Sequence, residues 1–459
     1  MLSNFFPSPA LASMRNLIPL LFAAACVAEP TAWLGGSNQK GGKATYEIKD
    51  GMLTGTAVAQ TPNSFLCTNK TYGDFTLEYE FNVDPRLNSG VQIRSNAYDT
   101  ETTFTDASGR VIKVPAGRVH GYQVEIDTDP THQASRQWTA GIFDEGRRGW
   151  LFPGTLGGNK TAFSEQGLRL TKVSDWNHVR IEAVGPRIRT WLNGEGRADI
   201  FDGATRSGFI GFQVHSINKR ELAGAQTRWR NVRLVEVAPN TLTKGEKDDG
   251  WVLLFDGTTT AGWRAYRGDA FPKKGWKVAD GILSVLGQGG GDLVATHAPI
   301  GVFELTVEFR LSPGANSGIF YLLQPSTSDP LPGLEFQLLD DLRHADAGKG
   351  KNGNRTVGAL YDLVAPGPVK APAAVDTWHH ALIRTSNDGK VVEHWLNGAL
   401  IVRYDRTSED FRSRRSASKF ADPKYGADFG EWPKGAILLQ DHGDRVDFRN
   451  IKLRELSAK

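Results

Sequence analysis

The stretch Gly121-Tyr-Gln-Val-Glu-Ile-Asp127 decides the fold, because a near-copy returns in the second half as Gly333-Leu-Glu-Phe-Gln-Leu-Leu-Asp340. Side chains of a β-strand alternate between its two faces. The first copy therefore places apolar side chains on one face and Gln123, Glu125 and Asp127 on the other. The second copy brings Glu335 and Gln337 together in the same way. An acid beside an amide, found twice, indicates a binding surface rather than a face that only meets solvent.

Other motifs repeat in the same order, which indicates a tandem duplication. Asn88-Ser-Gly90 is matched by Asn316-Ser-Gly318, and Trp191-Leu-Asn-Gly194 by Trp395-Leu-Asn-Gly398. Short strands separated by turn signals, with no helical segments between them, predict antiparallel β-sandwiches. We therefore predict an all-β chain of two tandem sandwiches at residues 30–238 and 249–457, joined by a linker at 239–248.

The composition agrees with a β-rich protein of two domains. The chain has 459 residues, of which 51 are glycine and 10% are aromatic. Its 54 basic and 51 acidic residues are interspersed and give a net charge of +3. No extended field of one sign is predicted, so we expect neither a nucleic-acid partner nor binding to a membrane surface.

The N-terminus is typical of an export signal. Arg15 precedes the apolar run Leu17–Ala25, which is too short to span a bilayer. We expect cleavage after Ala28 and a periplasmic or extracellular protein. A lipid anchor on Cys26 is the alternative, although Ala23 replaces the leucine that such a signal favours. No other segment is long and apolar enough to cross a membrane.

A set of short motifs in the second half occurs in a fixed order: Leu254-Phe-Asp-Gly257, Asn316-Ser-Gly-Ile319, Gly333-Leu-Glu-Phe-Gln337, Gly358-Ala-Leu-Tyr361, Trp395-Leu-Asn-Gly398, Leu439-Gln-Asp-His-Gly443 and Phe448-Arg-Asn-Ile451. Together they resemble the 3-keto-disaccharide hydrolase domain family. The first half is similar to a divergent member through Asn88-Ser-Gly90, Gly141–Trp150 and Trp191–Gly194. The resemblance implies two concanavalin A-like jelly rolls, a carbohydrate substrate, and cleavage of glycosides whose sugar is oxidised at C3.

A ketone at C3 makes the C2 hydrogen acidic, and the group on C1 can then leave by elimination. This reaction needs a base at C2, donors for the C3 oxygen and an acid for the departing oxygen. Water can add to the unsaturated product, so the overall change is a hydrolysis. A divalent metal ion could replace the donors, and it is the one cofactor that we consider.

The first half contains most of these groups. Gln92 and Arg94 alternate with apolar residues and are expected on one face, as are Gln213 and His215. We predict catalytic roles for Arg94, Glu125, Asp127 and His215. We predict substrate binding by Gln92, Gln123, Asp144, Arg147, Arg148, Trp150 and Gln213.

In the second half Leu322 stands at the position of Arg94. Glu335 and His442 are the catalytic candidates there, and Gln337, Tyr361 and Gln440 the binding candidates. Asp340, His344 and Asp346 could hold a metal, although a hydrogen-bonded polar loop is the commoner explanation of such a cluster. Because an enolate facing Leu322 would lose its cation, we expect the first half to be the catalytic one.

Two other functions are compatible with the sequence. Jelly rolls are common scaffolds for carbohydrate binding, so a lectin-like tandem protein without catalysis is the main alternative. Two rigid spacer modules in a surface assembly are the third possibility, and they would carry no ligand site.

Overall fold

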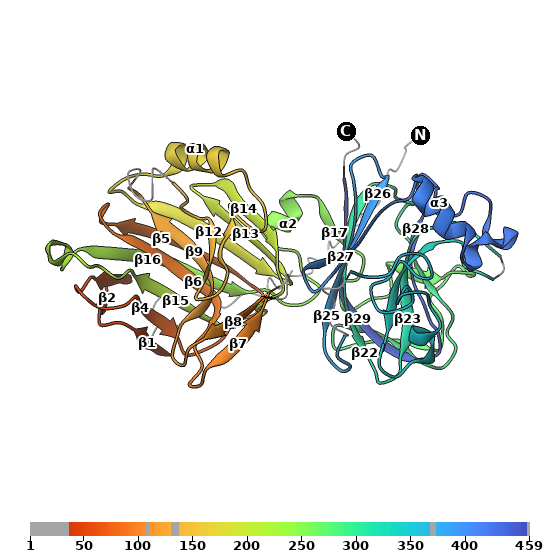
Figure 1. The fold of residues 1–459 in the computed structure, drawn as a ribbon. Helices are drawn as coiled ribbons and strands as arrows, with labels where there is room; N and C mark the ends of the chain where they lie inside the picture. Colours follow the sequence, from red (N-terminus) through yellow and green to blue (C-terminus); the bar gives the residue numbers. More distant parts are fainter. Residues whose placement is uncertain (1–35, 107–109, 130–136, 328, 368–372, 457–459) are drawn as a thin grey trace, which may run out of the picture.

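The computed structural model describes residues 36–106, 110–129, 137–327, 329–367 and 373–456. The predicted export signal at 1–28, including Cys26, lies outside these residues. Every pair of named strands is antiparallel, and the strands form two sandwiches side by side (Figure 1). The predicted all-β fold of two tandem jelly rolls is confirmed.

The first sandwich has two seven-stranded sheets. One, which we call the first site sheet, has the order β1 (Ser37–Gly41), β4 (Ser64–Thr68), β15 (Phe209–Val214), β6 (Asn88–Asn96), β9 (His120–Asp127), β10 (Ile142–Glu145) and β11 (Gly149–Phe152). The opposite sheet has the order β14 (Glu195–Phe201), β13 (Arg187–Leu192), β12 (Asn177–Val184), β5 (Phe75–Val83), β16 (Gln226–Glu236), β3 (Met52–Thr56) and β2 (Thr45–Lys49).

The second sandwich repeats this plan. Its site sheet has the order β18 (Trp263–Ala265), β21 (Leu293–Ala295), β28 (Ala436–Leu439), β23 (Asn316–Leu323) and β24 (Leu334–Leu339). The opposite sheet has the order β19 (Trp276–Ala279), β20 (Ile282–Leu286), β29 (Arg445–Glu455), β22 (Phe303–Leu311), β25 (His379–Thr385), β26 (Val391–Leu396) and β27 (Ala399–Asp405), and β17 (Trp251–Leu253) also pairs with β29.

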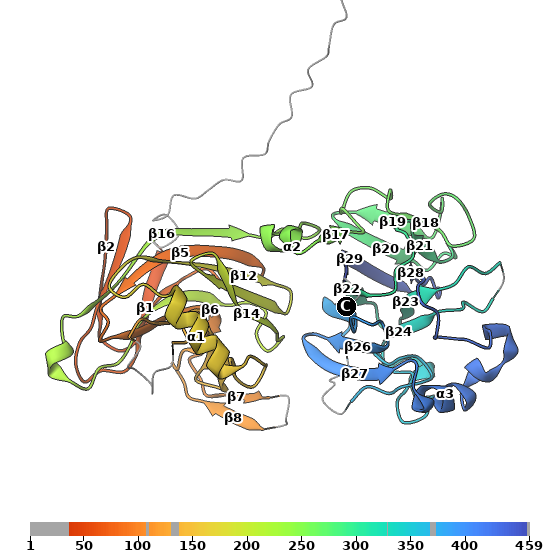
Figure 2. The ribbon, with the colours of Figure 1, turned by 90° about the horizontal axis from the view of Figure 1, so that it is seen from above.

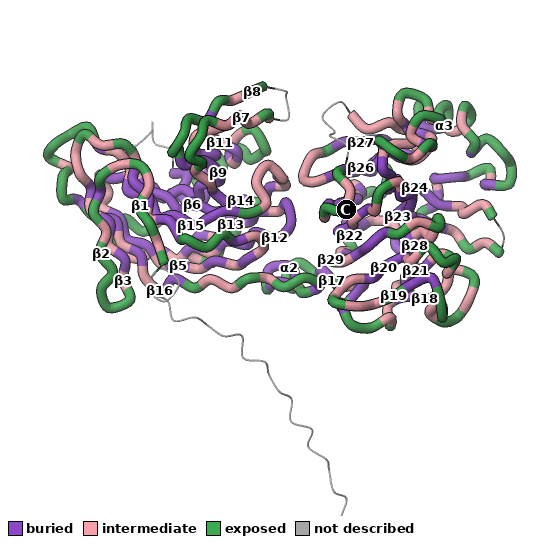
Figure 3. Tube along the Cα trace, turned by 90° about the horizontal axis from the view of Figure 1, so that it is seen from below, coloured by how far each residue is buried: buried purple, intermediate pink, exposed green. Residues whose placement is uncertain are grey.

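Each core lies between the two sheets of its sandwich. Tyr122, Val124 and Ile126 of β9 have no exposed surface and belong to the first core, as the alternation predicts. Leu334, Phe336 and Leu338 of β24 do the same in the second core. Because every residue of β9 and β24 is buried, these strands are covered on both faces (Figure 3).

Different segments lie outside the common plan in the two halves. The first half has the hairpin β7 (Thr102–Thr105) and β8 (Val111–Val114), the helix α1 (Lys160–Leu170) and the turn η3 (Arg220–Leu222). The second half has the turn η4 (Ala345–Gly348) and an insertion between β27 and β28 that contains α3 (Glu409–Ser416), η5 (Lys419–Ala421) and η6 (Pro423–Tyr425). In the part of the chain that the structure describes, no helix has the length and apolarity needed to cross a membrane.

A β-bulge occurs at the same place in both site sheets. The register of β6 shifts between Ile93 and Asn96, and Arg94 has a φ of 45°. The register of β23 shifts between Phe320 and Leu323, and Leu322 has a φ of 51°. A bulge rotates the following side chains out of the simple alternation. The duplication therefore preserved a bend that the sequence pattern does not show.

The expected linker contains a short helix, α2 (Lys244–Asp248), which lies between the two sandwiches (Figure 2). Thr243 and Glu246 form a capping box at its start. Glu182 of the first half accepts hydrogen bonds from the Thr243 hydroxyl at 2.8 Å and the Gly245 amide at 3.1 Å. Lys452 of the second half donates to Glu246 at 2.8 and 3.0 Å.

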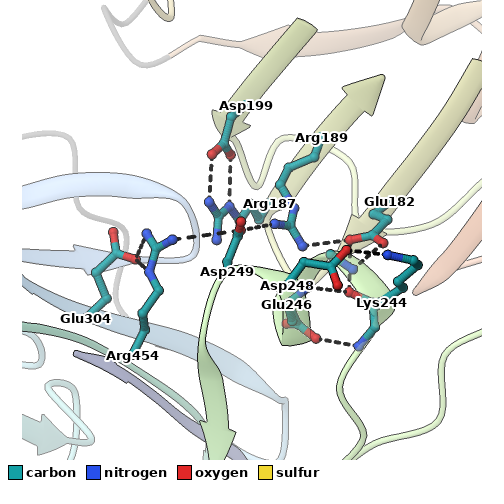
Figure 4. A network of polar contacts seen from close by, with 12 residues as sticks. Glu182, Arg187, Arg189, Asp199, Lys244, Glu246, Asp248, Asp249, Glu304 and Arg454 are labelled. Carbon is teal, nitrogen blue, oxygen red and sulfur yellow. Dashed lines mark hydrogen bonds and ion pairs between the residues drawn. The ribbon is translucent and has the colours of Figure 1, made fainter. Parts of the chain in front are cut away.

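The charged network around α2 continues into both halves (Figure 4). Asp249 forms ion pairs with Arg189 of the first half and Arg454 of the second. Arg454 also pairs with Glu304. Because these contacts join three segments far apart in sequence, α2 fastens the halves to each other.

We predict that Lys452→Met lowers the free energy of unfolding by about 3 kcal/mol, because it leaves the Glu246 carboxylate buried without its cation. Both side chains of this pair are nearly buried, at 5% and 11% exposed. The double variant with Glu246→Gln should recover most of the loss. Denaturant unfolding measures all of these values. The control is Lys244→Met, which removes the cation of an exposed pair with Asp248 and should cost under about 1 kcal/mol.

Candidate active site

The outer face of the first site sheet carries a continuous chain of polar side chains. The Ser95 hydroxyl donates to Gln92 at 2.8 Å, and Gln92 donates to Gln123 at 2.6 Å. Gln123 donates to Glu125 at 3.0 Å, and Asn88 donates to the other oxygen of Glu125. Gln92, Gln123 and Glu125 are therefore brought together as predicted, and both oxygens of the carboxylate are satisfied by amides.

The glycine of each Asn-Ser-Gly motif makes room for a long side chain on the neighbouring strand. A Cβ on Gly90 would lie 2.6 Å from Gln123 Cδ, and a Cβ on Gly318 would clash with the Glu335 carboxylate. Gly90 pairs with Glu125, and Gly318 pairs with Gln337. The acid and the amide have thus exchanged equivalent positions between the halves.

Burial raises the pKa of Glu125 to about 8, and the two amide donors oppose this rise. Glu145 lies close enough to contribute to the shift. Burial also raises the pKa of Glu145, while His215 and Arg118 lower it. Glu125, Glu145 and His215 therefore lie in one electrostatic environment, although His215 is half-buried just after β15 and its Nδ1 contacts its neighbour's carbonyl, Ser216 O, at 2.9 Å.

Gln213 and Asp127 flank this polar chain. Gln213 has no exposed surface, and neither of its side-chain polar atoms has a hydrogen-bond partner among the residues that the structure describes. Asp127 is 2% exposed and accepts a hydrogen bond from the Asp129 amide at 3.1 Å. Both side chains are on the predicted sheet, and the charge of Asp127 contributes to the raised pKa of Glu125.

The prediction that Arg94 faces the site beside Gln92 is wrong. The bulge after Ile93 turns Arg94 away, and its guanidinium donates to Gly73 O, Gly185 O and Asp74, the first two at 2.7 Å and the third at 2.9 Å. It has no exposed surface. Leu322, at the matching bulge, belongs to the second core. The expectation that the first half is catalytic rested on this arginine and loses its basis.

Asp144, Arg147 and Arg148 do not join the polar chain either. Asp144 pairs in register with Tyr122, whose side chain faces the core. Its carboxylate binds both arginines, and Arg148 also pairs with Asp202. These residues brace the sheet edge. Trp150 pairs with Phe143, which pairs with Gln123, so this half-buried indole does lie on the outer face, 4.5 Å from the Trp138 ring.

The second half presents Glu335 on the same face with a different environment. Glu335 is 8% exposed, and no donor among the residues that the structure describes reaches its carboxylate. Burial raises the pKa of Glu335 to about 8, while Lys419 lowers it and Asp346 raises it. A mostly buried carboxylate without an internal donor must find its hydrogen-bond partners in solvent or in a ligand. Glu125 of the first half has two donors, so within the described residues the two acids differ in how far they are satisfied.

Tyr361 lies beside Glu335 because the segment around Leu360 pairs with the edge of β24. The Tyr361 amide donates to Glu335 O at 3.1 Å, and Phe336 bridges to Leu360. The Tyr361 hydroxyl donates to Asp346 at 2.8 Å, and Arg355 donates to the other oxygen of Asp346 at 3.2 Å. Tyr361 is thereby fixed close to Glu335, and its role in substrate binding stays a prediction.

Lys419 supplies the cation of this cluster. Its ammonium lies 4.3 Å from the centre of the Tyr361 ring. Partial burial of the ammonium lowers the pKa of Lys419, and the charges of Glu335 and Asp362 oppose this change. The residue as a whole is exposed. It belongs to the insertion between β27 and β28, which the first half lacks.

The remaining candidates of the second half lie at the border of the cluster. Gln337 is 1% exposed, and its side-chain oxygen accepts from the Leu338 amide at 3.1 Å. β28 ends at Leu439, so Gln440 and His442 lie just beyond the strand. His442 is exposed, and its ring centre is 6.4 Å from that of His344.

The residues Asp340, His344 and Asp346 do not form the predicted metal site. Asp340 caps a turn by accepting from the Gly314 and Leu342 amides, and it also pairs with Arg343. Asp346 is engaged by Tyr361 and Arg355. Throughout the described ranges, no three His, Cys, Asp or Glu side chains converge as a metal site requires. The polar-loop explanation holds for this cluster.

Lys419, Asn88 and Arg355 are the site residues that the sequence analysis missed. Lys419 lies in an insertion without a counterpart in the first half, so the repeat could not reveal it. Asn88 belongs to a motif whose repetition indicates the duplication and the family resemblance, and its place beside Glu125 follows from the pairing of β6 with β9, where it lies opposite Asp127. No pattern distinguished Arg355 from other loop arginines.

We predict that Glu125→Gln changes the pH dependence of stability. A carboxyl with a folded pKa of about 8 keeps its proton where the unfolded chain has released it, so the wild type loses stability as pH rises from about 4.5 to 8. The variant lacks this loss, so its stability relative to wild type should improve by about 1 kcal/mol or more between pH 5 and pH 9. Unfolding at both pH values measures the difference, and an unchanged difference would contradict the prediction.

The chain is similar to several known proteins. A 37% identical relative, a 3-keto-disaccharide hydrolase of Bacteroides thetaiotaomicron, matches over 234 residues, which are 45% of this chain and 79% of the relative. A crystal structure from Parabacteroides distasonis, described as a candidate glycosyl hydrolase, is 29% identical with a TM-score of 0.42 over 48% of this chain and all of that one. The carbohydrate-binding module CBM66 of Bacillus subtilis is 17% identical with a TM-score of 0.25, over 43% of this chain and 96% of that module.

The family model for the 3-keto-alpha-glucoside-1,2-lyase-like domain matches twice, at residues 29–235 and 250–454. These two segments contain both sandwiches and both polar faces. The chain therefore belongs to the 3-keto-alpha-glucoside-1,2-lyase-like family, with two copies of its domain in tandem.

Proposed function

We propose that this protein is an exported enzyme that cleaves 3-keto-glycosides by elimination across C1 and C2, and that its active site is the Glu335 cluster of the second half. The observation that carries the proposal is the Glu335 carboxylate, which is mostly buried and receives no hydrogen bond from the residues that the structure describes. The family description names a 1,2-lyase of 3-keto-α-glucosides. A single base next to a cation fits that reaction.

In the proposed mechanism, Glu335 removes the proton from C2 and the electrons of the C–H bond form an enolate with the C3 ketone. The Lys419 ammonium stabilises the negative charge on the C3 oxygen. Collapse of the enolate breaks the C1–O bond, and the departing oxygen takes up, directly or through water, the proton that Glu335 removed from C2, which returns Glu335 to its ionised form. The products are a 1,2-unsaturated 3-keto sugar and the free alcohol. Addition of water to the double bond completes a hydrolysis.

The other side chains of the cluster hold these groups in place. Asp346 fixes the Tyr361 hydroxyl and is itself held by Arg355, while the Tyr361 ring supports the Lys419 ammonium. A pKa of about 8 for Glu335 suits a base that must both take and return a proton near neutral pH. A divalent ion remains a possible addition, to be tested by assays with EDTA and with added Mg²⁺ or Ca²⁺.

The first test compares Glu335→Gln with Glu125→Gln. Both substitutions remove an acid of raised pKa, and the two acids lie on matching strands. We expect Glu335→Gln to lower turnover of a 3-keto-disaccharide by about 10²–10⁴-fold, the usual contribution of a general base. Glu125→Gln should keep turnover within about threefold of wild type. Loss with Glu125→Gln alone would move the site to the first half. Sugar binding without any turnover would favour the lectin-like alternative.

The pH profile gives a second test. If Glu335 acts as the base, kcat/KM rises with pH until the carboxylate is fully ionised above about pH 8. Lys419→Met removes a cation that lowers the pKa of Glu335. The rising limb of kcat/KM should therefore move to higher pH, and the maximum of kcat/KM should fall. A limb that stays in place in Lys419→Met would separate Lys419 from Glu335.

Gly318→Ala gives a third test, because the added Cβ would displace the Glu335 carboxylate. We expect turnover to fall at least about tenfold, whereas Gly90→Ala, which displaces Gln123 in the first half, should leave it nearly unchanged. Thermal denaturation of both variants separates lost folding from lost activity.

A further inference from the structure

A groove of about 790 Å³ opens on the second sandwich, bordered by β18, β21 and the ends of β23 and β28. We propose that this groove binds the leaving group of the substrate and does so through a carboxylate on that group. The proposal rests on the proposed function, because that function places the reacting sugar at Glu335. Binding of an acid in the groove can be tested without measuring turnover.

The groove and Glu335 belong to one transverse row of the site sheet. Cross-strand pairing joins Glu335 to Phe320, Leu438, Val294 and Arg264 in that order. Residues paired in this way share a face. Four strand spacings place the Cα of Arg264 roughly 19 Å from that of Glu335. The three residues between them are 0–5% exposed, so a ligand of a few rings that joins the two ends must lie over the side chains that cover this row.

The charges that line the groove favour an anion. Its lining includes Arg264, Lys434 and His297, and none of its lining residues is Asp or Glu. Two acids near the groove have partners of their own, and one of these partners, His297, itself lines the groove. Asp329 pairs with Arg267, and Glu455 lies 3.7 Å from His297 Nε2. The Lys434 side chain has no ion pair with any residue in the described part of the chain.

Arg264 is arranged to receive a carboxylate. Its Nη1 donates to three carbonyls, Ala265 O, Tyr266 O and Gly268 O, at 3.0–3.2 Å. These contacts fix the plane of the guanidinium. Its Nε and Nη2 make no hydrogen bond to the described residues, and the residue is half-exposed. A fixed guanidinium with a free edge of two donors matches a carboxylate in bidentate geometry.

The remaining walls favour an organic acid over inorganic phosphate. Tyr266 is half-buried and donates its hydroxyl to Gln324 O at 2.7 Å, which fixes its ring beside the groove. Val294 and Leu323 form an apolar wall. A ligand with a ring and a carboxylate would use both the apolar wall and the cations. Acidic sugars and aromatic acids share this chemistry.

The experiment measures binding of matched pairs to the full-length protein by saturation-transfer NMR. The pairs are D-glucuronate with D-glucose and benzoate with benzyl alcohol. We expect the acid of at least one pair to bind about tenfold more tightly than its neutral partner. Preference in the sugar pair identifies an acidic sugar as the occupant, and preference in the benzoate pair an aromatic acid. Equal binding within both pairs overturns the proposal.

Arg264→Gln and Lys434→Gln should each reduce the preference for the acid and leave the neutral partner unaffected. If Arg264→Gln disturbs the loop around Arg264, Lys434→Gln still tests the proposal. The control is Arg267→Gln, which removes an exposed cation next to the groove that already has Asp329 as partner. An equal effect of Arg267→Gln would overturn the proposal in favour of general charge attraction.

A third measurement separates this proposal from the proposed function. Glu335→Gln should retain the preference for the acid, since Glu335 does not line the groove. An acid-binding groove in a protein that turns over no 3-keto-glycoside would refute the enzyme and leave the anion site. Turnover with no preference for acidic leaving groups would refute the groove and leave the enzyme.

Discussion

Burial of the middle strands on both faces is the constraint on which both halves depend. One face of β9 and of β24 enters a core, and the other is also covered, so every polar side chain there needs a partner. The first half meets this need with a chain of amides that ends on Glu125. In the described part of the second half, no donor reaches the Glu335 carboxylate. Two sheets of the same design therefore differ in whether their central acid is already satisfied.

The repeated bulge decides which side chains can reach this face. It turns position 94 and its counterpart 322 away from the sheet surface, so the replacement of an arginine by a leucine there changes the interior and not the site. Arg94 is stabilised by Asp74 and two carbonyls, and Leu322 by apolar neighbours. The cation of the second half comes instead from Lys419, on a separate segment.

Much of the fold could be predicted because strand alternation and the repeat are local properties of the sequence. They gave the two sandwiches, the core faces and the exchange of acid and amide between positions 123, 125, 335 and 337. The predicted orientation of Arg94 was wrong, because a bulge changes the alternation of side chains without a marked change in residue type. Lys419 was not predicted, because its insertion comes close to Tyr361 through tertiary packing and not through any local sequence pattern. The Asp340, His344 and Asp346 cluster was dense in sequence, yet its members are satisfied by turns and neighbouring cations.

The segments outside the common plan explain how the halves can differ in function while sharing a framework. The first half adds a hairpin between β6 and β9, and the second adds α3 and two short turns between β27 and β28. Such additions change what meets the polar face without altering the strands beneath it. Because α2 and its ion pairs fasten the sandwiches together, the first half also supports the fold of the second. A duplicated domain that no longer needs a free carboxylate can satisfy it internally, and this removes the cost of keeping an unpaired acid in that half.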